Sequence, residues 1–105
     1  MDEADRVRAR NRRVQEAMLP MAASLGSWGV ESGHWLPDRD GQPVVWLRTR
    51  TRAQRRALEK QVWLQAQVQT ILTRLGVAHE TVWKARLELT SAEDEAELLE
   101  EGGRW

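Results

Sequence analysis

The stretch from Thr51 to Leu75 constrains the fold most, because it predicts one long helix whose two ends are both specified. Thr51 and Gln54 make a capping box, in which the hydroxyl accepts a hydrogen bond from the third amide and the glutamine reaches back. Gly76 follows the last apolar turn and suits the left-handed residue that ends a helix. We therefore expect a central helix over residues 51–75, about 36 Å long.

One side of this predicted helix is apolar, which is typical of a helix that covers a sheet. The apolar side consists of Ala57, Leu64, Val68, Ile71 and Leu75. Val62, Trp63 and Ala66 point roughly the other way, and a helix with one buried face does not need them. Either the N-terminal helix or another chain covers them, and packing within the chain is the commoner reason. These three residues and Trp105 are our candidate partner-binding residues.

Residues 1–25 predict a helical arm. Its apolar side chains follow an alternating spacing of three and four with Asn11 in the middle, which is a seam that can pack on the domain or pair with another helix. Pro20 lacks an amide hydrogen and should end or kink the helix near Leu19, leaving residues 20–25 as a short second helical piece. The seam consists of Ala4, Val7, Asn11, Val14, Met18, Met21 and Leu25.

Residues 28–50 predict a β-hairpin, with strands from Trp28 to Leu36 and from Val44 to Arg50. Asp40-Gly41 supplies the positive φ that a tight turn needs. Val45 and Leu47 should lie on one face of the second strand, opposite to Val44, Trp46 and Arg48. On the first strand, Gly29 and Gly33 suggest a bulge or a close approach of another backbone.

Residues 82–90 alternate apolar and polar side chains and predict a third strand, with Lys84, Arg86 and Glu88 on a wet face. A right-handed crossover through the central helix would make this strand parallel to the second one. Ser91 is a suitable N-cap for an acidic helix over residues 91–101, and residues 102–105 form a tail. The sequence leaves the order of the strands open.

These elements predict a single α+β domain of 105 residues in the order α-β-β-α-β-α, with a three-stranded sheet packed on the long helix. The chain has no cysteine, so disulfides, thiolate chemistry and cysteine zinc sites are excluded. No apolar run approaches the roughly 20 residues that cross a bilayer. We expect a cytoplasmic protein without a membrane partner.

One histidine is placed where acid–base chemistry is conceivable. His34 lies near Glu31, Asp38 and Asp40, but the two aspartates are better explained as turn formers at a hairpin tip. No phosphate loop, nucleophile elbow or metal-ligand spacing is present in the sequence. We therefore expect no catalytic residues, no cofactor and no metal.

Two functions remain open. The leading one is a non-enzymatic protein-interaction module, a homodimer or an adaptor, because tryptophan and arginine are abundant and dominate many interfaces. The alternative is nucleic-acid binding by a basic segment, against which the acidic helix offers an internal partner for the same side chains. The basic segment consists of Arg48, Arg50, Arg52, Arg55, Arg56 and Lys60.

Overall fold

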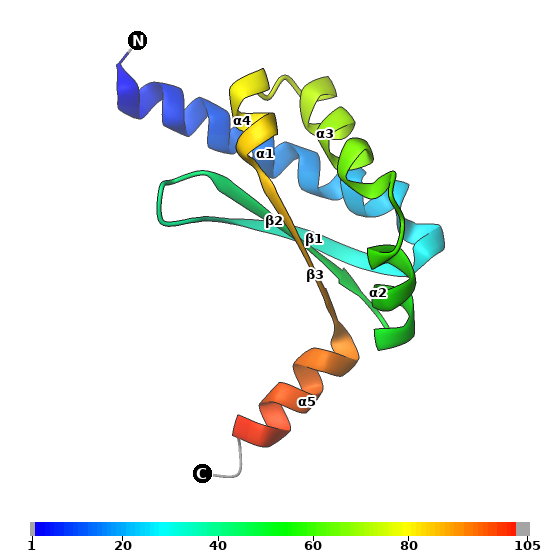
Figure 1. Ribbon diagram of the computed structural model, residues 1–105. Helices are drawn as coiled ribbons and strands as arrows, with labels where there is room; N and C mark the ends of the chain where they lie inside the picture. The colour runs from blue at the N-terminus through cyan, green and yellow to red at the C-terminus, as the bar shows by residue number, and fades with distance from the viewer. Residues whose placement is uncertain (1, 103–105) are drawn as a thin grey trace.

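The computed structural model describes residues 2–102, which form five α-helices, one 3-10 helix and three strands (Figure 1). This confirms the predicted α+β class and the order of its main elements. In chain order the elements are α1 (Glu3–Ser24), η1 (Gly26–Trp28), β1 (Val30–Pro37), β2 (Pro43–Thr49), α2 (Arg52–Glu59), α3 (Leu64–Arg74), α4 (His79–Lys84), β3 (Arg86–Ser91) and α5 (Ala92–Gly102).

The sheet has the order β1-β2-β3, so β2 lies in the middle. β1 and β2 are antiparallel, and β2 and β3 are parallel, as the right-handed crossover predicts. In the hairpin turn, the Asp38 carboxylate accepts from the amides of Asp40 and Gln42, and Gly41 has a φ of 79°. Asp38 is therefore a turn former.

A bulge in β1 decides which side chains face the core. The register shifts between Val30 and Ser32, so Val30 stays on the buried side while Ser32 and His34 turn to the opposite face. At Gly33, a side chain would approach Leu47 and the backbone of Met18, so α1 lies close against the strand. The glycines predicted a bulge or a close backbone approach. The close approach is found at Gly33, whereas the bulge lies at Glu31, between the two glycines.

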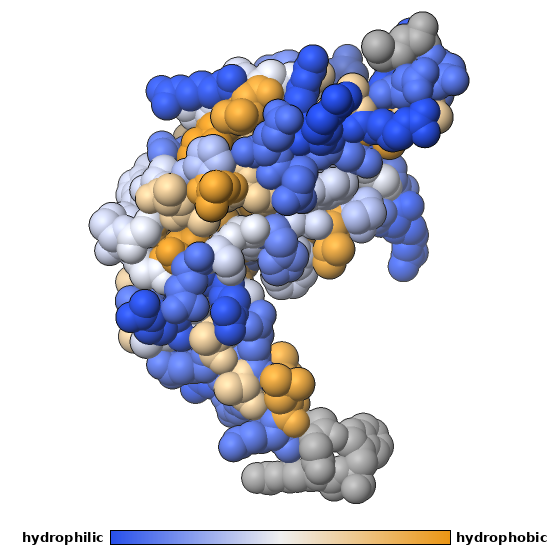
Figure 2. Space-filling view, turned by 180° about the vertical axis from the view of Figure 1, so that it is seen from behind, coloured by the Kyte–Doolittle hydropathy of each residue, from blue (hydrophilic) through white to orange (hydrophobic). Residues whose placement is uncertain are grey.

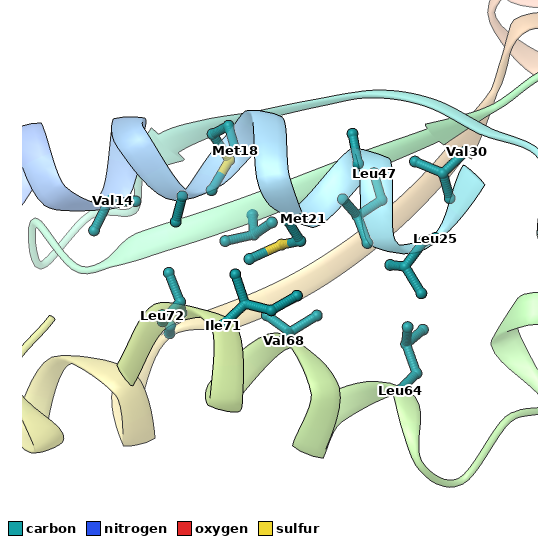
Figure 3. Close-up of a cluster of buried hydrophobic side chains, with 14 of the residues drawn as sticks. Val14, Met18, Met21, Leu25, Val30, Leu47, Leu64, Val68, Ile71 and Leu72 are labelled. Carbon is teal, nitrogen blue, oxygen red and sulfur yellow. The ribbon is translucent and has the colours of Figure 1, made fainter. Parts of the chain in front are cut away.

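The hydrophobic core lies on one face of the sheet, under α1 and α3. Figure 3 shows Met18 and Met21 of α1 with Ile71 and Leu72 of α3 in one cluster, with the strands behind them. The side chains in the C-terminal half of the predicted seam, from Val14 to Leu25, are buried in this core. That half of the seam is therefore not free to pair with another chain.

The predicted continuous helix over residues 51–75 is wrong, although both of its ends are correct. Thr51 and Gln54 form the capping box, and Gly76 has a φ of 85° where α3 ends. Between Lys60 and Trp63 the chain leaves the helix, because α2 packs on β2 and β3 whereas α3 packs on α1 and α4. One straight helix could not follow both surfaces.

Two further boundaries differ from the prediction. α1 continues through Pro20 to Ser24, because the turn after the proline buries Met21 and Ala22 in the core. Residues 82–84 belong to α4, so the third strand begins at Arg86. The short helix α4 buries Thr81 and Val82. Its apolar and polar residues alternate in step with those of the strand that follows, so in the sequence the two segments resemble one longer strand.

Candidate protein interface

Three arginines of the basic segment hold the acidic helix α5. Arg48 pairs with Glu95, Arg52 pairs with Asp94 and Glu97, and Arg55 pairs with Asp94. Arg48 comes from β2, whereas Arg52 and Arg55 lie in the first turns of α2, so residues distant along the chain meet here. The internal pairing that the sequence suggested is present.

Asp94 is the centre of this cluster. Its Oδ2 accepts from the Ser91 hydroxyl at 2.7 Å and from Arg55 Nε at 2.7 Å, while Arg52 Nε donates to Oδ1 at 2.6 Å. The Ser91 hydroxyl, followed by the Arg52 guanidinium and then that of Arg55, holds the pKa of Asp94 well below its usual range. The pairing therefore contributes to stability above the ordinary carboxyl range and is lost only as the pH falls through the lowered pKa.

The rest of the basic segment is divided between pairing and solvent. Glu31 pairs with Arg50 at 3.0 Å and with Arg48 at 3.5 Å. Arg56 and Lys60 are exposed and form no ion pair with the residues that the structure describes. A polyanion would therefore have to displace α5 to reach three of the six predicted residues.

The predicted partner-binding residues do not form one surface. Val62 is 97% exposed in the turn between α2 and α3, whereas Trp63 is half-buried and packs on Trp28 with ring centroids 5.4 Å apart. Ala66 is exposed farther along α3, beside Trp83 of α4. Trp105 lies outside the described residues. Trp63 therefore belongs largely to the fold.

The residues around His34 are engaged elsewhere. Glu31 is held by Arg48 and Arg50, and Asp38 shapes the hairpin turn. His34 stacks on Trp46 of the neighbouring strand, with ring centroids 6.3 Å apart and an interplanar angle of 6°. Glu31 and Asp38, the carboxylates considered beside His34, therefore have other partners.

This stack lies on the face of the sheet that α1 and α3 leave uncovered, which we call the open face. In Figure 1 those helices lie on one side of the sheet, and α5 extends from its end toward the other side. Leu36 stands beside Val44 there and is 56% exposed. The open face consists of Ser32, His34, Leu36, Val44, Trp46, Arg48, Arg86, Glu88 and Thr90.

The outer part of α5 carries a second apolar surface. Leu98 and Leu99 are 66% and 78% exposed. Figure 2 shows apolar side chains near the outer end of α5 and a molecule that is hollowed between this helix and the body. We call this hollow the recess, and α5 joins the open face at its inner end through the Arg48–Glu95 pair.

Sequence reasoning missed this surface, although part of the signal was present. The two faces of the second strand were predicted correctly, and both carry large apolar residues. The sequence did not say which face the helices would leave uncovered. Leu98 and Leu99 are adjacent apolar residues in an otherwise acidic helix, and that contrast would have pointed to them.

Comparison of the chain with known protein families, curated proteins and solved structures gives no significant match. Within residues 2–102, no helix is both long and apolar enough to span a membrane.

Proposed function

We propose that this protein is a non-enzymatic interaction module that binds another protein in the recess between the open face and α5. The observation that carries the proposal is a sheet covered by helices on one face only, with Trp46, His34 and Leu36 on the other. Neighbouring large apolar side chains on a protein surface mark an interaction site more often than single ones do.

The chemistry of the open face suits a protein partner. Aromatic residues and arginine are enriched in the centres of interfaces, and Trp46 lies in the middle strand with Arg48 two residues away. Arg86 and Glu88 are both exposed on β3 at the margin of the face. An apolar centre with a charged margin is the usual anatomy of such a site.

α5 supplies the second wall of the recess. Side-chain ion pairs hold its first turns to β2 and α2, while Leu98 and Leu99 lie beyond those pairs. A partner that covers Leu36 and Leu99 together would bury apolar surface on both walls. Each fully buried leucine contributes about 2 kcal/mol.

Site-specific photo-crosslinking tests the proposal. A benzoylphenylalanine placed at Leu36 or at Leu99, in cells that carry the native gene, should form a crosslink to the same protein. The matched control is Trp83, which is 65% exposed on α4 and lies beside α3. Crosslinks that are absent, or that are equally strong from Trp83, would contradict the proposal.

Polyanion binding is the second candidate. The observation in its favour is that Arg48, Arg52 and Arg55 already hold carboxylates, and guanidinium groups bind phosphate with the same geometry. This function requires release of α5, so we expect it only in a chain whose acidic helix is displaced or removed.

A further inference from the structure

β3 is an edge strand of the sheet, and its outer edge is paired with no strand of the described chain. Among the described residues β3 pairs only with β2, and in Figure 1 it crosses in front of the other strands. α2 packs against β3 from the core side, where its Leu58 is buried, and leaves no strand paired with the outer edge. Proteins usually protect such edges with proline, with charged side chains (lysine above all), with a bulge or with a covering helix or loop. Of these devices, β3 carries the charges of Arg86 and Glu88. Residues 86–91 contain neither proline nor lysine, and their register with β2 has no shift.

The other edge of the sheet is protected. β1 carries the bulge at Glu31 and ends in Pro37. The contrast between the two edges indicates that β3 is available for pairing with a further strand.

We propose that a second copy of this chain pairs with the outer edge of β3. The two β3 strands run antiparallel across a two-fold axis that passes between the two copies of Leu87. The pairing rests on the view of the protein as an interaction module. It uses the edge of β3 and shares Arg86 and Glu88 with the margin of the open face, but it does not require a partner in the recess.

Charge favours this register. An axis at Leu89 would set Glu88 opposite Thr90 of the second copy and form neither ion pair. Across a two-fold axis normal to the sheet, the two strands run antiparallel and each residue faces one on the same side of the sheet. An axis through Leu87 sets Arg86 opposite Glu88 of the second copy, and Glu88 opposite its Arg86. An axis through Arg86 would oppose two arginines, and an axis through Glu88 would oppose two glutamates, both of which are unfavourable.

The residues on the helix-covered side of β3 agree with this register. Leu87 and Leu89 are only half-buried, and together with Leu64 they line an open hollow beside the interruption between α2 and α3. In the proposed pair, Leu87 lies against Leu87 of the second copy and covers part of that hollow. The same contact would cover the exposed edge of the core and give the backbone groups on the outer edge of β3 their hydrogen-bond partners.

The pairing would join two three-stranded sheets into one sheet of six strands. A two-fold axis normal to the sheet keeps both open faces on the same side. A dimer would therefore present two recesses in one direction.

A charge-reversal experiment tests the ion pairs. Sedimentation velocity at increasing concentration should show a dimer for the wild-type chain. Arg86→Glu alone and Glu88→Arg alone should each weaken association at least tenfold, because like charges then face each other. A mixture of the two variants should restore association, since every facing pair in the mixed dimer has opposite charges. The double variant with both changes should associate like the wild type.

A cysteine experiment tests the register. The chain has no natural cysteine, so Leu87→Cys introduces the only thiol. Opposed Cα atoms in an antiparallel pair lie about 4.5–5.5 Å apart, within the range of a disulfide. Leu87→Cys should form a disulfide-linked dimer under mild oxidation. Leu89→Cys is the matched control, because its two copies would lie four residues apart and should not link.

Several outcomes would overturn the proposal: a wild-type chain that stays monomeric, a dimer that ignores both charge reversals, or equal linking through Leu89→Cys. Circular dichroism of each variant shows whether it folds, and Arg86 and Glu88 are exposed and outside every ion pair described above. Crosslinking from Leu36 is read separately. A protein that binds a partner in the recess but does not dimerise would give crosslinks from Leu36 and sediment as a monomer. A dimer without a recess partner would sediment as a dimer and give no such crosslinks.

Discussion

At the scale of single residues, the junction between η1 and α2 depends on a glycine. Gly29 has a φ of 91°, a conformation that residues with a side chain rarely adopt. Its carbonyl accepts from the amide of Arg50, and a Cβ at this position would overlap the side-chain amide of Gln54. Because Gln54 completes the capping box with Thr51, the glycine also protects the start of α2.

Gly29→Ala should lower the free energy of unfolding by about 2 kcal/mol, from backbone strain together with loss of the cap. Gly26→Ala is the matched control, since it lies three residues earlier with open space around its Cα and a φ outside the left-handed region. Urea unfolding of both variants measures the difference. Equal stability of the two would show that the junction tolerates a side chain at Gly29.

At the scale of elements, the interruption between α2 and α3 lets one crossover connection cover two surfaces. Trp63 lies at the start of α3, packs on Trp28 of η1, and donates from its indole nitrogen to Gln61 Oε1 at 3.1 Å. The aromatic pair connects the turn to the segment that enters the hairpin. Val62, its immediate neighbour, is exposed to solvent.

Trp63→Ala should therefore destabilise the fold by about 2 kcal/mol, which is less than for a fully buried tryptophan. Val62→Ser should change stability by less than about 0.5 kcal/mol. Thermal and urea unfolding of the two single variants measure this. If Trp63→Ala instead left stability unchanged and abolished binding to a partner, the residue would belong to an interface after all.

At the scale of the whole molecule, charge is separated along the chain and recombined by the fold. The net charge is zero, but residues 92–105 contain six acidic residues and one arginine, so the remainder carries a net charge of +5. In the structure, carboxylates of α5 form ion pairs with arginines of the basic segment. The recombined surface presents fewer free arginines than the sequence suggests.

Deletion of residues 92–105 should expose Arg48, Arg52 and Arg55 and produce binding to a labelled DNA duplex that weakens steeply with salt. Fluorescence anisotropy of the full-length and truncated chains measures the change, with heparin as competitor. The control is the truncated chain with Arg52→Glu and Arg55→Glu, which should not bind. Equal affinity of the full-length and truncated chains would show that α5 does not mask the arginines.

The sequence by itself determined what short-range chemistry specifies. The capping box at Thr51, the glycine end at Gly76, the turn at Gly41 and the cap at Ser91 each depend on residues a few positions apart. The two faces of β2 follow from strict alternation. These signals were sufficient for the α+β class and the order of its main elements.

Only the tertiary structure decided the features that depend on packing between distant segments. The helix break at Lys60–Trp63, the continuation of α1 through Pro20 and the strand order all follow from which surfaces need cover. The candidate site has the same origin. Trp46 and Leu36 are available to a partner because α1 and α3 cover the opposite face of the sheet. The charge of the basic segment is partly neutralised because α5 pairs with it. No local pattern contains that information, since burial and pairing are properties of the assembled chain.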